Sequence, residues 1–465
     1  MTNDFDFHRQ IPSLEPVDVV VCGGGPSGFP AAVAAARAGL RVMLVESGNQ
    51  LGGVGTSAGI SHLLGGRSRD NRHWAVAGIF REVVEDLADA GGAIHPAEIE
   101  GSDDAYSPFG WVRGRHSTLA YGVPFDTNQM VALLDRKALD AGIDVTFGTS
   151  VTDVVVSDQR VTGVVINSKS GLQHLPCRAV VDATGDADVA AKSGCDVVKG
   201  REGDQAMTPA TLAFHVGHVD QDALARYIEE SGENRFRELI GSLREQGVWK
   251  FPYDVFISAQ STEPGTLMIN TTRICDVDGT DRRSITRGLM QGRAEINELF
   301  PLMKQHFPGF ADARIRSVAP SLGIRETRRI VADYVYRVTD LIDARDFDDT
   351  IAFSAYGWDL PDPRKPSYQP LHDRKTQMTR PYTPIPYRIM VPRPVGNVVC
   401  PGRSVSVERD VLGPLRVMGP CYGMGHAAGL AAVQVARRDC RFSEVDTDSL
   451  RRDLREAGAV VDWPS

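Results

Sequence analysis

A glycine-rich turn between an apolar strand and a helix constrains this chain more than any other feature of its sequence. Residues 17–22 (VDVVVC) are mostly β-branched, which predicts a central parallel strand that is buried on both faces. The turn Gly23-Gly24-Gly25-Pro26-Ser27-Gly28 follows at once. A helix over 31–39 and a second strand over 41–45, closed by Glu46, come next. This order predicts a βαβ unit of the Rossmann type.

Each conspicuous residue of this unit has a physical task. Gly23 permits the tight turn, Gly25 lets the backbone approach a pyrophosphate, and Gly28 allows the helix to pack closely on the strand. The helix N-terminus offers free N–H groups to phosphates. Glu46 is placed to accept a hydrogen bond from a ribose hydroxyl, and its charge repels a 2′-phosphate. The motif therefore predicts FAD or NAD as the cofactor, in preference to NADP.

The sequence after Glu46 favours FAD. A long glycine-rich loop runs over 47–59, as though backbone followed an extended ligand, where an NAD enzyme would normally begin another αβ unit. Two β-rich runs, 145–156 and 160–167, flank Ser157-Asp158-Gln159 and predict a hairpin. A third strand over 178–182 ends in Ala183-Thr184-Gly185-Asp186.

Five motifs in this order resemble the FAD-dependent oxidoreductases of the glutathione-reductase-like superfamily, and most closely a broad bacterial group of FAD-dependent oxidoreductases. They are the GGGPxG turn, the LGG-x2-TSxG segment at 51–59, the ATGD strand end at 183–186, the IRETRR-x-V-x-DY segment at 324–334, and a C-terminal stretch with Gly402-Arg403, RVM at 416–418 and GxAAGxAA at 425–432. The likeness covers residues 17 to 437. It implies an α/β fold in which a discontinuous Rossmann-type FAD-binding domain carries an inserted α+β substrate domain.

The resemblance also implies which residues hold FAD. The adenosine half would lie on the glycine turn and Glu46, with Val151 beside adenine, and the flavin half would lie near the C-terminal motifs. The residues assigned to the cofactor are Gly23, Gly25, Pro26, Ser27, Gly28, Glu46, Gly52, Gly53, Thr56, Ser57, Val151, Thr184, Gly185, Asp186, Gly402, Gly425, His426 and Ala427.

A helix expected over 425–436 has its own physical argument. Its glycine-rich, uncharged start leaves N–H groups free for an external acceptor. The resemblance puts Gly425, His426 and Ala427 under the pyrimidine edge of the flavin, where the helix would stabilise the negative charge of the reduced state. A tightly packed Ala/Gly helix without a ligand explains the same residues.

The middle of the chain has a different composition. A polar helix is expected over 221–246, a short strand over 266–272 and a longer helix over 282–306, and a proline-rich segment follows over 361–394. The predicted domains are 1–204 with 395–465 for FAD binding, and 205–394 as the substrate or cap domain. Residues 63–125 are too irregular to assign.

Four residues are candidates for the chemistry. His62 follows the loop that the likeness brings to the flavin, and histidine is a natural base near neutral pH, although it equally suits a loop hydrogen bond. Tyr356 and Asp359 lie where relatives often show Tyr-Pro-x-Asp-x-His, a pattern whose histidine is absent here. Arg403 ends a strand at the ligand side of the sheet.

Three further arginines, Arg325, Arg328 and Arg329, lie close together with Glu326. They could form an anion clamp or a structural ion-pair network, and the sequence leaves both interpretations open.

Composition excludes several classes of function. The 51 basic and 60 acidic residues give a net charge of −9, so no broad nucleic-acid or anionic-lipid footprint is expected. No apolar run is long enough for a membrane span. The seven cysteines lack C-x-x-C spacing, which argues against a metal site and a disulfide framework and favours a reducing cytoplasm. Residues 1–10 do not resemble a secretory signal.

The sequence leaves competing reactions open. The first is an oxidase or dehydrogenase that transfers hydride from a C–H next to oxygen or nitrogen of a small polar substrate to flavin N5, with His62 as base. The second is fumarate-reductase-like reduction of an activated alkene with Arg403 as proton donor. The third is a non-redox or structural use of FAD. No second dinucleotide motif follows a strand, so the electron acceptor is dioxygen, a quinone or a carrier protein; a homo-oligomer is left open.

Overall fold

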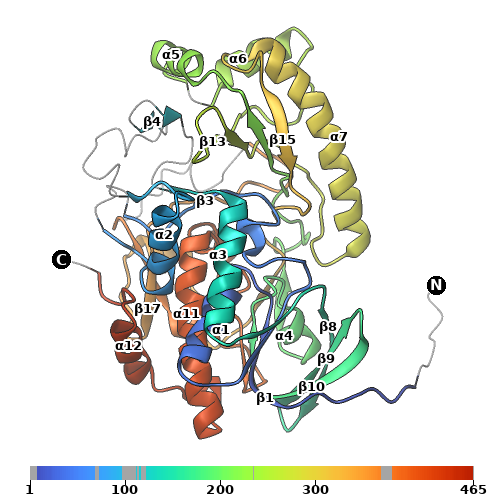
Figure 1. Cartoon of the computed structure of the whole chain (residues 1–465), viewed down its shortest axis with the longest axis vertical. Coiled ribbons are helices and arrows are strands. Elements are labelled where there is room, and N and C mark those ends of the chain that lie inside the picture. Colours follow the sequence, from blue (N-terminus) through green and yellow to red (C-terminus); the bar gives the residue numbers. More distant parts are fainter. Residues whose placement is uncertain are drawn as a thin grey trace.

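A seven-stranded sheet forms the centre of the larger part of the molecule (Figure 1). The computed structural model describes residues 8–68, 73–96, 111–112, 115–116, 122–233, 235–367 and 380–463. The strand order is β7-β2-β1-β10-β9-β8, and β19 pairs with β10. The bounds are β1 Val17–Cys22, β2 Val42–Val45, β7 Asp144–Thr146, β8 Ser150–Ser157, β9 Arg160–Ser168, β10 Gly171–Asp182 and β19 Val398–Val399.

The strand β10 has both antiparallel and parallel neighbours. Its first half pairs antiparallel with β9, and its second half pairs parallel with β1 and β19. The predicted hairpin is confirmed, because Asp158 and Gln159 form the β8–β9 turn with φ of 51° and 58°. The predicted parallel strands 17–22 and 41–45 are also confirmed, the second as β2.

The central strand β1 is buried on both faces, as its composition predicts. Val19 and Val21 belong to a core that helices α1 and α11 complete, whereas Val20 and Cys22 belong to a second core on the other face. Helices on the first face are α1 Gly28–Arg37, α2 Ile79–Asp89, α3 Thr127–Asp140, α11 Met418–Arg438 and α12 Thr447–Glu456, and α4 Asp188–Lys192 lies on the second. The predicted Rossmann-type α/β fold is confirmed.

Two glycines of α11 allow it to pack directly on α1. A Cβ atom at Gly425 would lie 2.0 Å from the Ser27 carbonyl oxygen, and one at Gly429 would lie 2.3 Å from the Ala31 carbonyl oxygen. Neither distance is possible for a real side chain, so only glycine permits this approach. The contact brings the C-terminal helix against the first helix of the chain (Figure 1).

The inserted part has an antiparallel sheet and a core of its own. The sheet has the order β13-β14-β12-β15, and α5, α6 and α7 accompany it at the top of Figure 1. Phe236, Phe256 and Phe307 pack against one another inside this core. The bounds are β12 Phe214–Gly217, β13 Ser258–Gln260, β14 Leu267–Ile269, β15 Arg314–Val318, α5 Gln221–Ser231, α6 Arg237–Glu245 and α7 Arg282–His306.

The expectation of one helix over 221–246 is wrong. Gly232 has φ of 68° and ends α5, and Phe236 adopts the left-handed conformation immediately before α6. Phe236 is fully buried, so the gain from packing its ring outweighs the cost of breaking the helix. The helix expected over 282–306 is confirmed with the same bounds.

The remaining elements join the two parts or cover the larger one. Buried residues from 336 to 390, among them Tyr336, Ile351 and Ile385, belong to the core of α1 and α11, whereas the core of the inserted part ends at Leu322. The domain division at 204/205 and 394/395 stays a prediction, and these cores favour an earlier end of the insertion. The bounds are β3 His62–Leu63, β4 Trp111–Val112, β5 Arg115–His116, β6 Val123–Pro124, β11 Val197–Lys199, β16 Arg328–Ile330, α8 Val338–Ile342, β17 Thr350–Ser354, β18 Thr383–Pro386 and α10 Leu412–Leu415.

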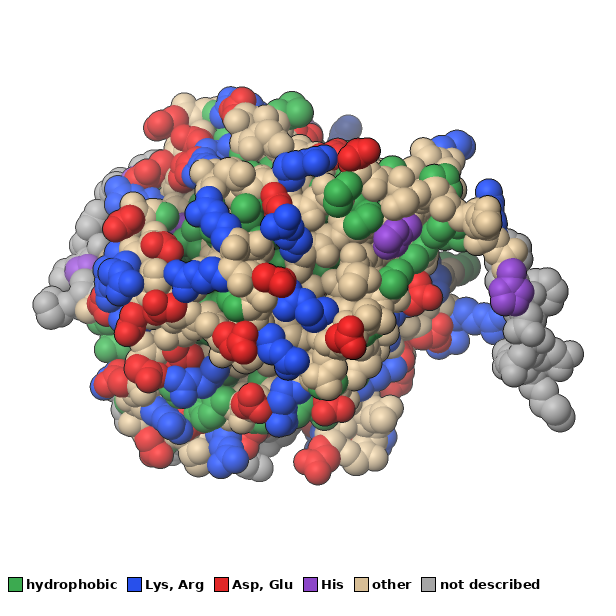
Figure 2. Space-filling view, turned by 90° about the horizontal axis from the view of Figure 1, so that it is seen from below, with side chains coloured by type: hydrophobic (Ala, Val, Ile, Leu, Met, Phe, Trp, Pro, Cys, Tyr) green, Lys and Arg blue, Asp and Glu red, His purple; other side chains and the backbone are tan. Residues whose placement is uncertain are grey.

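Acidic and basic side chains alternate over the face seen from below in Figure 2, without a large area of one sign. In the part of the chain that the structure describes, every helix is too short or too polar to cross a lipid bilayer.

The α1–α11 contact predicts a specific loss of stability. Gly425→Ala places a methyl group against the Ser27 carbonyl and should destabilise the fold by about 1–3 kcal/mol, as overpacking does. Gly241→Ala is the matched control, because Gly241 lies inside α6 and no atom approaches within 4 Å of the position that an added methyl group would take. That variant should be neutral or more stable by up to about 1 kcal/mol. Denaturant unfolding measures both, and equal midpoints for the two variants would contradict the close packing.

Candidate active site

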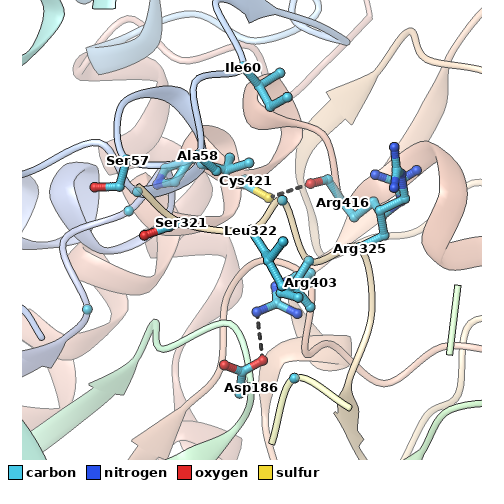
Figure 3. A pocket seen from close by; sticks show the side chains of 18 of the residues that line it. Ser57, Ala58, Ile60, Asp186, Ser321, Leu322, Arg325, Arg403, Arg416 and Cys421 are labelled. Atoms are coloured by element: carbon cyan, nitrogen blue, oxygen red, sulfur yellow. Dashed lines mark hydrogen bonds and ion pairs between the residues drawn. The ribbon is translucent and has the colours of Figure 1, made fainter. Parts of the chain in front are cut away.

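One cavity of about 700 Å³ extends from the glycine turn to the inserted part. The turn after β1, the ends of β2 and β10, and the start of α11 form one region of its wall. Residues of the inserted part, including Asn270, Arg273 and Arg325, form another. Figure 3 labels Asp186 after β10, Cys421 in α11 and Arg325, among other residues around the cavity. The glycine turn and the residues of the inserted part therefore face one continuous, partly open cavity.

The glycine turn has the geometry that its sequence predicts. Gly23 has φ of 100°, and a Cβ there would lie 2.5 Å from the Ala183 carbonyl oxygen. A Cβ at Gly28 would lie 1.7 Å from the Gly23 carbonyl oxygen, so Gly28 serves helix–strand packing. At Gly25 a Cβ would meet only Gly53 Cα, at 3.8 Å, so here bare backbone faces the cavity. The residues present fit a pyrophosphate against Gly25.

Glu46 joins the glycine turn to the loop after β2. Its Oε2 accepts a hydrogen bond from the Gly24 N–H at 2.7 Å, and its Oε1 accepts one from the Gly48 N–H at 2.6 Å. The side chain lines the cavity. A carboxylate has about four acceptor positions, so a ribose hydroxyl can still donate to it.

Of the residues assigned to the cofactor or to catalysis, the cavity brings together fourteen, and the other eight lie outside its wall. Those that line it are Gly23, Gly25, Pro26, Ser27, Glu46, Gly53, Ser57, His62, Val151, Thr184, Asp186, Tyr356, Asp359 and Arg403. Those behind the wall are Gly28, Gly52, Thr56, Gly185, Gly402, Gly425, His426 and Ala427. Several of the second group still shape the cavity. The Thr56 hydroxyl donates to the Leu51 carbonyl at 2.6 Å, and Gly402 packs closely against the Ser27 side chain.

The expected start of the C-terminal helix needs a correction. The helix α11 begins at Met418, not at Gly425, and Val417, Met418 and Cys421 line the cavity. Gly425, His426 and Ala427 lie about two turns further along, where Gly425 packs on α1. The His426 ring packs against Gly78, and burial lowers its pKa to about 4. The proposed contact of these three residues with a flavin is therefore not supported, and the N-terminal dipole acts from Met418.

The turn after β10 is held by a buried carboxylate that the sequence analysis did not single out. Asp182 accepts hydrogen bonds from the Thr184 hydroxyl at 2.6 Å and from the Ala190 N–H at 2.9 Å. Burial raises its pKa to about 6. In the sequence VVDATGD at 180–186, Asp182 directly precedes the ATGD motif at 183–186.

Arg403 is ion-paired at the cavity wall. Its Nη2 donates to Asp186 Oδ1 at 2.6 Å, and the Thr327 hydroxyl donates to the same oxygen at 2.7 Å (Figure 3). The pair connects the chain after β19 with the chain after β10. Because its positive charge is already compensated by Asp186, Arg403 is poorly suited to stabilising a second anion or to donating a proton.

His62 is a neutral histidine inside the cavity wall. It lies in β3 with 1% of its surface exposed, and its Nδ1 has no hydrogen-bond partner in the described structure. Burial, with a smaller contribution from nearby His215, lowers the pKa of His62 to about 3. The imidazole is therefore uncharged near neutral pH, and it takes up a proton only where a bound ligand reaches Nδ1 and stabilises the imidazolium that forms.

Tyr356, Asp359 and Arg416 form a hydrogen-bonded group in the same wall. The Tyr356 hydroxyl donates to Asp359 Oδ2 at 3.1 Å, and Arg416 Nη2 donates to the same oxygen at 3.1 Å and to the Asp359 carbonyl at 2.6 Å. Burial alone would raise the pKa of Asp359, but Arg416 and Arg325 outweigh it and hold the pKa below its usual value. Asp359 is therefore ionised near neutral pH.

The three arginines of the 324–334 segment have different roles. Arg328 pairs with Asp188 at 2.8 Å, and the buried Arg329 donates to the Gly200 and Val407 carbonyls. These two are structural. Only Arg325 lines the cavity, so the network interpretation fits Arg328 and Arg329, and the anion clamp stays a prediction for Arg325.

Four cavity arginines, Arg235, Arg273, Arg282 and Arg416, were not singled out. Arg273 has no motif around it, and Arg416 stands in the RVM segment, which was quoted without a role. Their proximity to Arg325 arises only from folding. Cys421 also lines the cavity, but burial raises its pKa to about 12, so it is a neutral thiol.

Comparison with known proteins assigns the chain to a family. The model of the FAD dependent oxidoreductase family matches residues 18–454. The chain belongs to this family. It is an FAD-dependent oxidoreductase, and FAD is its cofactor.

Individual relatives match a smaller part of this chain than the family model does. The thiamine thiazole synthase of Aeropyrum pernix is 35% identical over 188 residues, which cover 38% of this chain and 57% of that protein. The dihydrolipoyl dehydrogenase of Trypanosoma brucei brucei is 47% identical over 53 residues, 11% of each chain. The match thus spans little more than half the length of the thiazole synthase.

Solved structures with a similar fold include two from archaea. A geranylgeranyl bacteriochlorophyll reductase-like protein from Thermoplasma acidophilum is 12% identical, with a TM-score of 0.44 and coverage of 95% of this chain and 84% of that one. The L-proline dehydrogenase from P. horikoshii is 11% identical, with a TM-score of 0.41 and coverage of 96% and 99%.

Within the described ranges of this oxidoreductase, no three His, Cys, Asp or Glu residues are grouped as they would be around a metal ion.

The contacts of Glu46 predict a loss of FAD affinity on mutation. Glu46→Ala removes two hydrogen bonds that organise the cofactor loops as well as the acceptor for ribose, so FAD should bind about 10- to 100-fold more weakly, the equivalent of about 1.5–3 kcal/mol. Glu46→Gln keeps one acceptor and should lose less. The measurement is fluorescence titration of the deflavinated protein with FAD.

The control is Glu202→Ala, which removes an exposed carboxylate outside the cavity. Unchanged FAD affinity in Glu46→Ala, with the control also unchanged, would mean that another group holds the ribose.

Proposed function

We propose that this enzyme is an oxidase or dehydrogenase that removes hydride from a C–H next to oxygen or nitrogen of a small polar substrate. The observation that carries the proposal is the single cavity. It has the glycine turn and Glu46 on one side, and His62, Tyr356 and the arginines on the other. Bound FAD supplies a flavin that accepts the hydride with its two electrons.

The residues that would hold FAD come from several segments that are distant in the sequence. Gly25 offers bare backbone to the pyrophosphate, Glu46 an acceptor to the ribose, and Val151 an apolar surface to the adenine. Asp186 and Arg403 also line the cavity, and their opposite charges compensate each other. The start of α11 at Met418 directs its N–H dipoles toward the cavity, a favourable potential for negative charge.

His62 is the proposed proton acceptor. As the C–H bond breaks, the neighbouring O–H or N–H must lose its proton so that a C=O or C=N bond can form. The neutral imidazole with its open Nδ1 can take that proton. Burial keeps the ring uncharged and excludes bulk water from it.

Reduction of an activated alkene is the second candidate. The excess of arginines at the cavity favours it, because they would polarise an alkene conjugated to a carboxylate. Its assigned proton donor, Arg403, is ion-paired with Asp186, which weakens this alternative.

The test of the proposed function is anaerobic reduction of the flavin. Small alcohols, hydroxy acids, amines and amino acids are mixed one by one with the purified holoenzyme without oxygen, and the visible flavin absorbance is followed. Bleaching by a member of the panel supports the proposal. Turnover of a substrate without any change in redox state would instead support a non-redox use of FAD.

The position of His62 predicts both a rate and a pH profile. His62→Ala should slow flavin reduction by about 100-fold, the loss expected for a general base. Because the pKa of His62 is about 3, the ring is already neutral at higher pH, and the wild-type rate should show no histidine titration between about pH 5 and 8. Stopped-flow reduction at several pH values measures both effects.

Two variants sharpen this test. His73→Ala removes an exposed histidine outside the cavity and should leave the rate unchanged. Tyr356→Phe tests the competing proton acceptor. A full rate in His62→Ala combined with a slow rate in Tyr356→Phe would move the base to Tyr356.

A further inference from the structure

Three arginines from distant parts of the chain meet at the cavity. Arg273 follows β14, Arg325 precedes β16, and Arg416 precedes α11. Figure 3 shows Arg325 and Arg416 close together at the wall. Each side chain affects the electrostatics of its neighbours, since Arg273 and Arg416 are among the groups that lower the pKa of Arg325, after burial itself.

These charges are only partly compensated. Asp359 is the carboxylate that pairs with Arg416, at 3.1 Å. Arg325 donates to neutral acceptors, the Pro209 carbonyl at 2.5 Å and the Thr211 hydroxyl at 2.6 Å. Arg273 Nη1 donates to three main-chain carbonyls, the shortest at 2.9 Å. Among the residues that the structure describes, positive charge at this wall therefore exceeds the negative charge of Asp359.

Glu295, behind Arg273, compensates little of this charge. Its Oε1 accepts from the Tyr253 hydroxyl at 2.6 Å and from the Arg273 main-chain N–H at 3.2 Å, so it does not hold the guanidinium. Burial also raises its pKa, which favours the neutral form.

Unused donors mark where a ligand would bind. Arg273 is 5% exposed, and within the described ranges its buried Nε has no hydrogen-bond partner; the same holds for the buried Nε of Arg416. Leaving such charged donors unpaired is costly, so an acceptor is expected to complete them. Asn270 Oδ1, on the same wall, is a buried acceptor that also lacks a partner among the described residues.

We propose that Arg273, Arg325 and Arg416 bind a carboxylate group of the substrate, so that the substrate is a small carboxylic acid such as a hydroxy or amino acid. The proposal rests on the proposed function for the reaction that follows binding. A carboxylate has two oxygens with about four acceptor positions, so it can accept hydrogen bonds from more than one of these guanidinium groups. Asn270 Oδ1 is available to a hydroxyl or amino group of the same molecule.

The first experiment tests binding without turnover. The holoenzyme is titrated by calorimetry with propionate and succinate, with their neutral amides propionamide and succinamide, and with inorganic phosphate. We expect saturable binding of at least one carboxylate and none of its amide. Equal binding of acid and amide, or tighter binding of phosphate than of either carboxylate, would overturn the proposal. This arm uses the wild-type protein and does not depend on a variant that folds.

The second experiment assigns the binding to the cluster. Arg325→Met should weaken carboxylate binding by about 10- to 100-fold, the loss of one charge-assisted interaction. Arg325→Lys should recover part of the affinity, because it keeps the charge but not the planar fork. Arg287→Met is the matched control, since it removes an exposed arginine of α7 outside the cavity and should bind as the wild type does. Melting temperature and FAD content report whether each variant is folded.

The outcomes separate this proposal from the proposed function. Arginine-dependent binding of carboxylates that never bleach the flavin would retain the carboxylate site and contradict the hydride-removing reaction. Reduction of the flavin by an uncharged substrate, at the same rate in wild type and in a folded Arg325→Met variant, would retain the reaction and overturn the carboxylate site.

Discussion

The direct contact of α11 with α1 is the constraint on which the rest of the site depends. Gly425 and Gly429 bring the two helix backbones together, and no larger residue fits at either position. The start of α11 is thereby fixed beside the glycine turn that precedes α1. Because Arg416 and Met418 stand at that start, the same contact also sets where the substrate side of the cavity meets the cofactor side.

Charge is arranged differently at the two sides. On the cofactor side, Arg403 and Asp186 neutralise each other and Glu46 is satisfied by backbone N–H groups. At the wall formed by Arg273, Arg325 and Arg416, where we propose that the substrate binds, arginine charge exceeds carboxylate charge among the described residues. An enzyme of this family that selects carboxylic acids needs uncompensated positive charge at its substrate site. A wall whose positive and negative charges balance does not favour an anion over a neutral molecule.

The sequence predicted the local features of the fold and of the cofactor side well. The glycine turn, the hairpin at Asp158 and the helix over 282–306 all depend on neighbouring residues, whose spacing carries the signal. The start of α11 was misplaced because the segment 418–424 contains Pro420 and two glycines, which are poor helix formers. Packing against α1 and the loop at Gly66 overrides that preference.

The proposed substrate site was largely outside the reach of sequence reasoning, because Arg273, Arg325 and Arg416 are separated along the chain and only tertiary packing unites them. The pairing of Arg403 with Asp186 was hidden for the same reason, although both residues had been singled out.

The position of β10 in the sheet has a consequence for how the protein is made. Val180 pairs with Val20 on one side and with Val398 on the other, so both parallel neighbours of this strand come from remote parts of the chain. Proteins dominated by such non-local pairings fold slowly, and a chain emerging from the ribosome begins at its N-terminus. The glycine turn is synthesised well before β19 and α11. Stable capture of the cofactor must therefore wait until β19 and α11 have also been synthesised.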